Sequence, residues 1–238
     1  MSGSNKKRKF ITRTLGALVI AAVVIPAYFL QGGVYFHWVL RFGFLMALIE
    51  FSTVVCKSYF LPLHYNEYAV TVLLFVELTT CLLGLGLSQL PVELIGGCVF
   101  VCVITDVVAY LMGTFAGGEL FKERPFPKTS PNKSYEGLLF GLSMGIIAAF
   151  CWTLFYRNTD SPILFWRLAI VAPLSVAGDL VESRFKRLHD VKDANDFVID
   201  TPVIGWLEKP LGGRDGHGGY LDRLDSLALV LFIQLLIP

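Results

Sequence analysis

The chain has 238 residues, of which 55% are hydrophobic and only 16% are charged, and its mean hydropathy is +0.63. Soluble domains carry about 25% charged residues, so the composition favours an integral membrane protein over a soluble one. The net charge of +1 indicates nothing about partners, because the charged residues are segregated along the chain.

Apolar runs long enough to cross a bilayer follow one another through the sequence. We predict an all-α, polytopic membrane protein with about seven transmembrane helices, since each needs about 20 apolar residues. The predicted spans are residues 10–30, 34–56, 68–88, 91–116, 137–156, 162–182 and 224–238. The run after the basic N-terminus is too long for the core of a typical signal peptide, so we expect it to be retained as the first span.

The distribution of Lys and Arg predicts which side of the membrane each loop occupies. If the N-terminus is cytoplasmic, nearly all basic residues outside the spans fall on the cytoplasmic side, and only Arg157 falls on the other. This asymmetry agrees with the positive-inside rule. It places both long polar loops, about 117–136 and 183–223, in the cytoplasm, where nucleotides are found.

Asp179, Ser183 and Lys186 are spaced to lie along one helix face at the end of the sixth predicted span. A carboxylate and a hydroxyl one turn apart offer oxygen ligands to a hard cation, and a lysine one turn further can hold a phosphate. The alternative is an interfacial helix end whose charges only face water. Ionisable groups at membrane depth are costly and usually have a function, so both interpretations stay open.

The segment before the last predicted span is rich first in glycine and then in acids. It contains Gly216, His217, Gly218, Gly219, Asp222, Arg223 and Asp225. Glycines let backbone N–H groups approach a phosphate closely, and a helix N-terminus adds further donors. Asp222 and Asp225 share a helix face and offer ligands to a metal. Alternatively, they are acids that favour a helix N-terminus.

Asp106, Tyr110 and Gly113 share a face at the end of the fourth predicted span. We expect Asp106 to face the helix bundle, either in a functional site or paired with a basic residue. In the loop that follows, Ser134 can simply start the fifth helix, and Lys128 and Lys133 can equally hold a polyphosphate. The remaining charges within spans have no recognisable spacing, and we expect them to pair across helices or to lie near an interface: Arg41, Glu50, Glu77 and Arg167.

Together these segments resemble the signature of the phosphatidate cytidylyltransferase (CDP-diacylglycerol synthase) family. Its elements Ser-x-x-Lys-Arg, Lys-Asp, Gly-His-Gly-Gly and Asp-Arg-x-Asp are matched by Ser183–Arg187, Lys192–Asp193, Gly216–Gly219 and Asp222–Asp225. Two upstream elements of the family match at Asp106–Gly113 and Ser130–Gly137. Several motifs in the family's order make the resemblance strong, whereas each motif alone is weak.

The resemblance covers the chain from about residue 100 to its end. We therefore expect N-terminal transmembrane helices over residues 1–100 and a cytidylyltransferase-like catalytic membrane region over 101–238. Two departures fall in the second polar loop. The stretch between Asp193 and His217 is longer than in the family pattern, which predicts an insertion at about 194–214, and Asp215 stands where the family has proline.

The resemblance implies a role for each matching residue. The expected metal ligands are Asp179, Asp222 and Asp225. The expected catalytic residues are Ser183, Lys186, Arg187, Lys192, Asp193, His217 and Arg223. The expected nucleotide-binding residues are Lys133, Glu136, Gly216, Gly218 and Gly219. The implied cofactor is Mg²⁺, and a second, monovalent cation is left open.

The implied reaction is attack of phosphatidate on the α-phosphorus of CTP, which forms CDP-diacylglycerol and pyrophosphate for phospholipid biosynthesis. The expected partners are CTP, phosphatidate or a related lipid phosphate, and membrane lipids, with no nucleic acid; a homodimer is left open. We expect an integral protein of a bacterial inner membrane, with the active site on the cytoplasmic side.

Two other functions compete with this one. A CTP-dependent polyprenol kinase, or a cytidylyltransferase acting on an ether or isoprenoid lipid, would share the membrane setting and parts of the signature. A cation transporter would use Asp106 and Asp179 as an intramembrane path, but it leaves the clustered cytoplasmic motifs unexplained.

Overall fold

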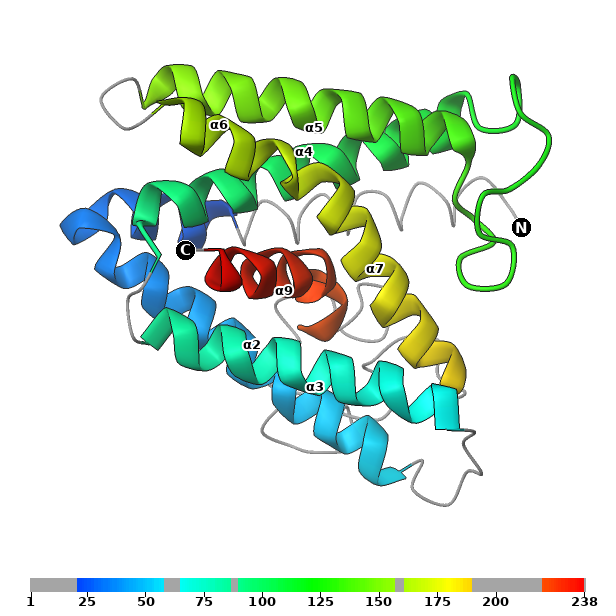
Figure 1. The fold of residues 1–238 in the computed structure, drawn as a ribbon, viewed down its shortest axis with the longest axis horizontal. Coiled ribbons are helices and arrows are strands. Elements are labelled where there is room, and N and C mark those ends of the chain that lie inside the picture. Colours follow the sequence, from blue (N-terminus) through cyan, green and yellow to red (C-terminus); the bar gives the residue numbers. More distant parts are fainter. Residues whose placement is uncertain (1–20, 58–64, 87–89, 157–160, 190–219, 238) are drawn as a thin grey trace. The chain divides into compact units, whose positions relative to one another are not determined.

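The computed structural model describes residues 21–57, 65–86, 90–156, 161–189 and 220–237. Every regular element in these ranges is helical, which confirms the predicted all-α class. The elements in chain order are η1 (Leu30–Gly33), α2 (Val34–Lys57), α3 (Tyr65–Gly86), α4 (Val92–Phe115), α5 (Tyr135–Phe155), α6 (Ser161–Ala169), α7 (Val171–Leu188) and α9 (Leu221–Leu236) (Figure 1).

Five helical segments are long and apolar enough to cross a membrane, so the chain is a polytopic membrane protein. They are Val34–Cys56, Tyr68–Leu85, Val92–Phe115, Tyr135–Phe155 and Pro162–Leu188. The first of the seven predicted spans lies mostly outside the described residues. The last corresponds to α9, whose 16 residues give a length of about 24 Å, short of a hydrocarbon core of about 30 Å.

Helix α5 buries small side chains and exposes large ones. On α5 the buried positions include Gly141, Gly145 and Ala149, whereas Phe140 and Phe150 are about half exposed, at 47% and 54%. Small interfacial residues let membrane helices approach closely, while large apolar side chains face the lipid. This distribution is what a helix bundle surrounded by hydrocarbon requires.

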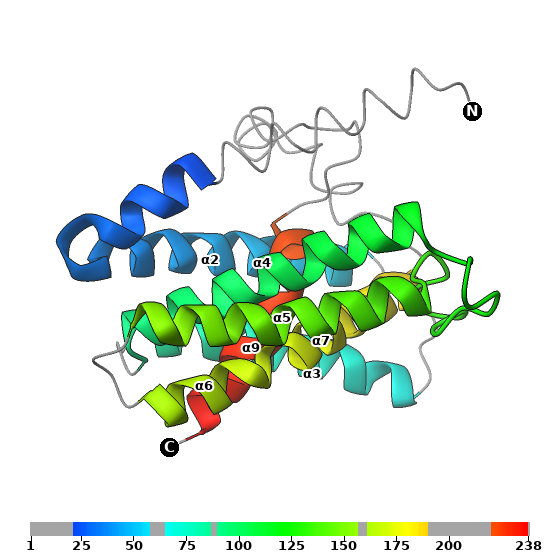
Figure 2. The same ribbon diagram turned by 90° about the horizontal axis from the view of Figure 1, so that it is seen from above.

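The stripe of glycines on α5 explains how closely that helix packs on α4 (Figures 1 and 2). A Cβ built on Gly137 would lie 2.6 Å from the carbonyl oxygen of Ala109, and one on Gly141 would lie 2.9 Å from the Thr105 carbonyl oxygen. Any larger residue would push the helices apart. The contact places the C-terminal end of α4 beside the N-terminal end of α5, and these ends flank the loop over residues 116–134.

The sixth predicted span is one apolar segment that bends between α6 and α7. Proline has no N–H, so Pro173 cannot donate to the carbonyl of Ala169, four residues earlier. The α6 helix ends at Ala169 and α7 begins at Val171. The described span also continues to Leu188, six residues beyond the predicted end.

The chain forms two compact units, and the division between them passes within α7 and α9. The first unit comprises residues 1–69 and 186–224, and the second comprises 70–185 and 225–238. Each unit therefore joins segments that are far apart in the sequence. The functional boundary expected near residue 100 stays a prediction.

Candidate metal centre

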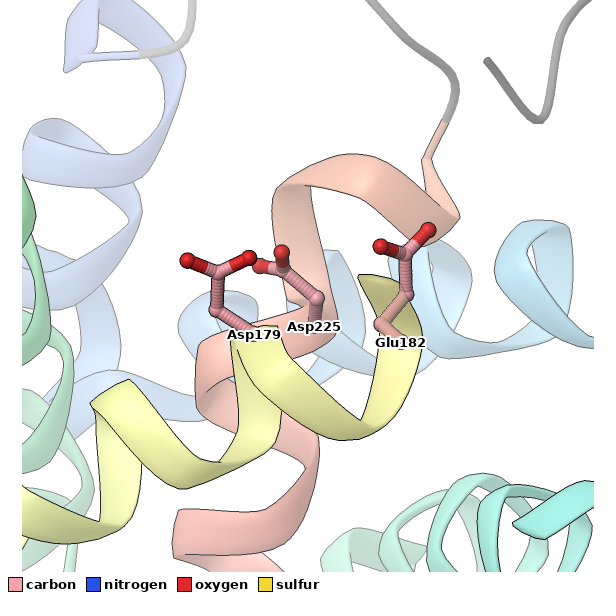
Figure 3. A group of neighbouring side chains, drawn as sticks. All are labelled: Asp179, Glu182 and Asp225. Carbon is pink, nitrogen blue, oxygen red and sulfur yellow. The ribbon is translucent and has the colours of Figure 1, made fainter. Parts of the chain in front are cut away.

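Three carboxylates meet in the second unit. Asp179 and Glu182 lie one turn apart on α7, and Asp225 belongs to the beginning of α9. One ligand oxygen from each lies within 4.8 Å of those of the other two. In Figure 3 the three side chains project toward the same side of their helices, and those of Asp179 and Asp225 lie next to each other.

Gly178 on α7, which has no Cβ, lets α7 and α9 approach closely enough to form the cluster. A Cβ built on Gly178 would lie 2.6 Å from the carbonyl oxygen of Asp225 and 3.2 Å from the Cα of Ser226. Both contacts are with backbone atoms, which cannot rotate away. Glycine at position 178 therefore lets α7 pass directly over α9, and the next residue along α7 is the cluster's own Asp179.

A lysine and a hydroxyl complete one side of the cluster. Lys133, from the loop between α4 and α5, forms an ion pair with Asp179. The Ser183 hydroxyl donates to Oδ1 of Asp179 over 3.2 Å. The Lys133 and Asp179 side chains keep 24% and 29% of their surface exposed, so this side of the cluster stays open to a polar ligand.

Ser226 connects the cluster to α4. Its hydroxyl lies 3.0 Å from Oδ2 of Asp106 and 3.2 Å from Oδ1 of Asp225, so both carboxylates can accept from it. Its backbone N–H also donates to Asp225 Oδ1 over 2.6 Å. Asp106 thus shares the Ser226 hydroxyl with Asp225 of the cluster, and its role in the site stays a prediction.

Glu136 braces the loop that carries Lys133. Its Oε1 accepts backbone N–H bonds from Gly118, Leu120 and Phe121, at 2.9–3.1 Å. At the end of the same loop, the Ser134 hydroxyl caps α5 by accepting from the Gly137 N–H. Three donors on one oxygen hold residues 118–121 against the start of α5, so this geometry favours a bracing role for Glu136. The expected contact with nucleotide stays a prediction.

A separate charged pair lies in the first unit. Lys186 donates to Oδ1 of Asp222 over 2.6 Å, and the two side chains are 17% and 11% exposed. Lys186 is in the last turn of α7 and Asp222 is in the first turn of α9. A mostly buried ion pair of this kind holds the carboxylate at a defined position and keeps a lysine beside it.

The structure accounts for part of the predicted site. It brings together Asp179, Ser183, Asp225 and Lys133, and it pairs Lys186 with Asp222. Arg187 is exposed at the end of α7, and Arg223 is partly buried in the first turn of α9. The remaining predicted residues, together with the expected insertion at 194–214, lie outside the described residues: Lys192, Asp193, Gly216, His217, Gly218 and Gly219.

Sequence reasoning missed Glu182, Ser226 and the packing role of Gly178. A signal existed for Glu182, because it follows Asp179 by three positions and so shares its helix face. Asp225 and Ser226 are neighbours in the sequence, but only the structure shows that the hydroxyl also reaches Asp106. Nothing in the sequence indicates that α9 is the helix that Gly178 meets.

The chemistry of the donor set fits a hard divalent cation. Carboxylates this close together repel one another unless a cation or a proton lies between them. All three side chains offer oxygen, which is the ligand that Mg²⁺ prefers over nitrogen or sulfur. The residues present can therefore hold a metal ion.

Comparison with known proteins points to one family. The model of the cytidylyltransferase family matches residues 1–200. Among similar proteins, the phosphatidate cytidylyltransferase of Haemophilus influenzae is 38% identical over 121 residues, which is 48% of this chain and 36% of that protein. The Bacillus subtilis enzyme of the same name is 36% identical over 139 residues, or 56% and 43% of the two chains.

A third relative, the phosphatidate cytidylyltransferase of Helicobacter pylori, is 32% identical over 149 residues, which is 59% of this chain and 50% of that protein. The matched part of the chain thus spans half or less of the length of each of these three relatives. No solved structure matches the chain.

Proposed function

Because the chain belongs to the cytidylyltransferase family, we propose that it transfers the cytidylyl group of CTP to phosphatidate, forming CDP-diacylglycerol and pyrophosphate. The observation that carries the proposal is the cluster of Asp179, Glu182 and Asp225, with Lys133 paired to it. A cation held by carboxylates beside a lysine is what two polyanionic reactants need in order to meet. The names of the three relatives support phosphatidate as the acceptor.

The proposed reaction is a single phosphoryl-type displacement. A phosphate oxygen of phosphatidate forms a bond to the α-phosphorus of CTP, and the bond from that phosphorus to the bridging oxygen of pyrophosphate breaks. The electron pair leaves with pyrophosphate. The phosphate monoester is already anionic near neutral pH, so no strong general base is required. Catalysis then depends on positioning and on charge stabilisation.

We assign the metal to the three clustered acids. Mg²⁺ bound there would neutralise charge on the triphosphate and polarise the phosphorus that is attacked. Asp179 and Asp225 present partly exposed carboxylates, and Glu182 presents a buried one. The Ser183 hydroxyl orients Asp179 through its hydrogen bond.

Lys133 and Lys186 would bind phosphates. Lys133 forms an ion pair with Asp179 and is partly exposed, so it can turn toward an incoming triphosphate. In the first unit Lys186 pairs with Asp222, and the metal-ligand role of Asp222 stays a prediction from the family pattern. The phosphate-binding roles of Arg187, Lys192, Asp193, Gly216–Gly219 and Arg223 stay predictions from the family pattern.

The basic residues support an orientation in the membrane. Lys122, Arg124, Lys128 and Lys133 all lie between α4 and α5, and we assign this loop to the cytoplasm by the positive-inside rule. The loop carries the lysine that pairs with Asp179. The site would then open toward the compartment that contains CTP.

The test uses purified chain in detergent–phosphatidate micelles with CTP and Mg²⁺, and it measures pyrophosphate release and the lipid product. We expect Asp179→Asn and Asp225→Asn each to abolish turnover, because each removes a charged ligand. Glu123→Gln is the matched control, since Glu123 is an exposed acid of the loop and should leave turnover unchanged. Full activity in excess chelator would rule out the metal role.

The same assay separates the proposal from a lipid kinase. Phosphatidate and a polyprenol are offered together with CTP labelled either on the α-phosphate or on the γ-phosphate. Label from the α-position in a CDP-lipid supports cytidylyl transfer. Label from the γ-position on the polyprenol, with none from the α-position, would contradict it.

A further inference from the structure

The N-terminus of α9 is capped by a carboxylate from a helix far away in the sequence. Glu50, on α2, accepts the backbone N–H of Tyr220 at Oε1 over 2.9 Å and that of Leu221 at Oε2 over 2.8 Å. Its side chain is 0% exposed. The four residues at a helix N-terminus lack intrahelical partners for their N–H groups, and here two consecutive donors are satisfied by one distant side chain.

Each of the two carboxyl oxygens of Glu50 accepts one backbone N–H group. A carboxylate offers both of its oxygens as acceptors. A negative charge is also favoured at a helix N-terminus by the macrodipole. Both effects favour a carboxyl group at this position of the span.

Further contacts in the first unit seat the same turn of α9 on α2. The rings of Phe42 and Tyr220 pack edge to face with their centroids 6.3 Å apart. A Cβ built on Gly43 would lie 3.2 Å from a methyl carbon of Leu224. Gly43 and Glu50 are seven positions apart, and they therefore lie on one face of α2. Contacts with that face fix the position of the first turn of α9 along α2 and its rotation about its own axis.

The opposite end of α9 offers a comparison. In the second unit, Arg167 donates to the backbone carbonyls of Gln234 and Ile237 and to the Gln234 side chain, and the Gln234 side chain donates back to the Arg167 carbonyl. The positive charge of Arg167 is favourable at a helix C-terminus. Both ends of α9 are therefore anchored by a charge from another helix, and the two acids of α9, Asp222 and Asp225, lie in its N-terminal half.

We propose that Glu50 is a positioning residue for metal binding: by anchoring the Tyr220 and Leu221 amides, it sets the placement of Asp222, the next residue of α9, which pairs with Lys186. Asp225 follows three positions later on the same helix. The inference rests on the proposed function for the identity of the metal site, but it concerns a residue that touches neither metal nor substrate.

The test compares Glu50→Gln with Arg167→Gln in purified, detergent-solubilised protein. Glutamine keeps the size of the side chain but presents an NH₂ group to one of the two N–H donors, so one of the two cap bonds is lost and the other is made to a neutral oxygen. Three quantities are measured: Mn²⁺ binding by electron paramagnetic resonance, the Mg²⁺ concentration for half-maximal turnover, and amide hydrogen exchange in residues 220–226. Arg167→Gln loosens the other end of the same helix and serves as the matched control.

We expect Glu50→Gln to weaken Mn²⁺ binding about 10- to 100-fold, the range found when groups that orient metal ligands are removed. The half-maximal Mg²⁺ concentration should rise in parallel, and the amides of residues 220–226 should exchange faster. Arg167→Gln should lower the unfolding temperature with metal affinity unchanged. Equal losses of metal affinity in both variants, or unchanged affinity in Glu50→Gln, would overturn the inference.

Failure of the proposed function gives a different result. If the wild-type chain binds Mn²⁺ in a Glu50-dependent way but transfers no cytidylyl group to phosphatidate, the reaction is wrong and the positioning role stands. If the wild-type chain transfers the group but Glu50→Gln leaves Mn²⁺ and Mg²⁺ affinity unchanged, the reaction stands and the positioning role is wrong. If the wild-type chain binds no Mn²⁺, the positioning role also fails.

Discussion

Gly178 lies against the backbone of Asp225, so that a Cβ at position 178 would sit 2.6 Å from the Asp225 carbonyl oxygen. This relationship determines how near Asp179 can come to Asp225, because the two helices cannot move apart without separating their carboxylates. The acidic cluster therefore depends on a residue that has no side chain to contribute.

Gly178→Ala should disrupt the cluster. The added methyl group meets rigid backbone, and overpacking of this kind costs about 1–3 kcal/mol of stability. We expect turnover and Mn²⁺ binding to be lost at temperatures where the variant is still folded. Thermal unfolding and metal binding in detergent measure the two effects. Gly84→Ala is the control, since its Cβ would meet only side-chain atoms of Leu235, which can rotate; equal losses in both variants would argue against a specific role for Gly178.

Glu182→Gln should weaken metal binding although the sequence motif did not single out this residue. Loss of one carboxylate from a three-acid site should lower metal affinity by about 10-fold or more, as for other charge-assisted contacts of roughly 1.5–3 kcal/mol. Titration with Mg²⁺ under saturating CTP measures the shift. An unchanged titration curve would show that Glu182 lies near the metal without binding it.

Lys133→Met should raise the KM for CTP. Removing a charge-assisted contact to phosphate costs roughly 1.5–3 kcal/mol, or about 10- to 100-fold in affinity. The measurement is the dependence of initial rate on CTP concentration at fixed Mg²⁺. Lys122→Met, at an exposed position of the same loop, should leave the KM unchanged. A fall in kcat with unchanged KM would instead indicate that Lys133 stabilises the transition state and not bound CTP.

Glu136→Gln should release the loop over residues 116–134. The charged oxygen that accepts three N–H bonds becomes a neutral amide oxygen, and each bond weakens. We expect faster proteolysis in this loop and a reduced rate of turnover, both measured against Glu123→Gln. Protease resistance equal to that of the wild type would contradict the bracing role.

Labelling of a cysteine placed in this loop tests the orientation. In a background without native cysteines, Lys122→Cys introduces a thiol at an exposed position. A membrane-impermeant maleimide should label it in inverted inner-membrane vesicles and leave it unlabelled in intact cells. Labelling in intact cells would reverse the assigned topology.

The sequence by itself determined the class of protein and which neighbouring residues share a helix face. Hydrophobic runs of membrane-spanning length specify helices, because a backbone in hydrocarbon must satisfy its own hydrogen bonds. The spacing of Asp179 and Ser183 was also sufficient to predict that the two side chains lie together, since the helix repeat places both on one face. The structure joins them by a hydrogen bond. These are properties of local sequence.

Only the tertiary structure decided which residues meet across helices. The meeting of Asp179 with Asp225, the ion pair of Lys133 with Asp179 and the cap that Glu50 places on α9 each join segments distant in the sequence. Such contacts depend on how close two helices pack and on their rotation, and small residues such as Gly178 and Gly141 set both. A glycine in the sequence indicates that another helix can pack closely at that position, but only the fold determines which helix packs there.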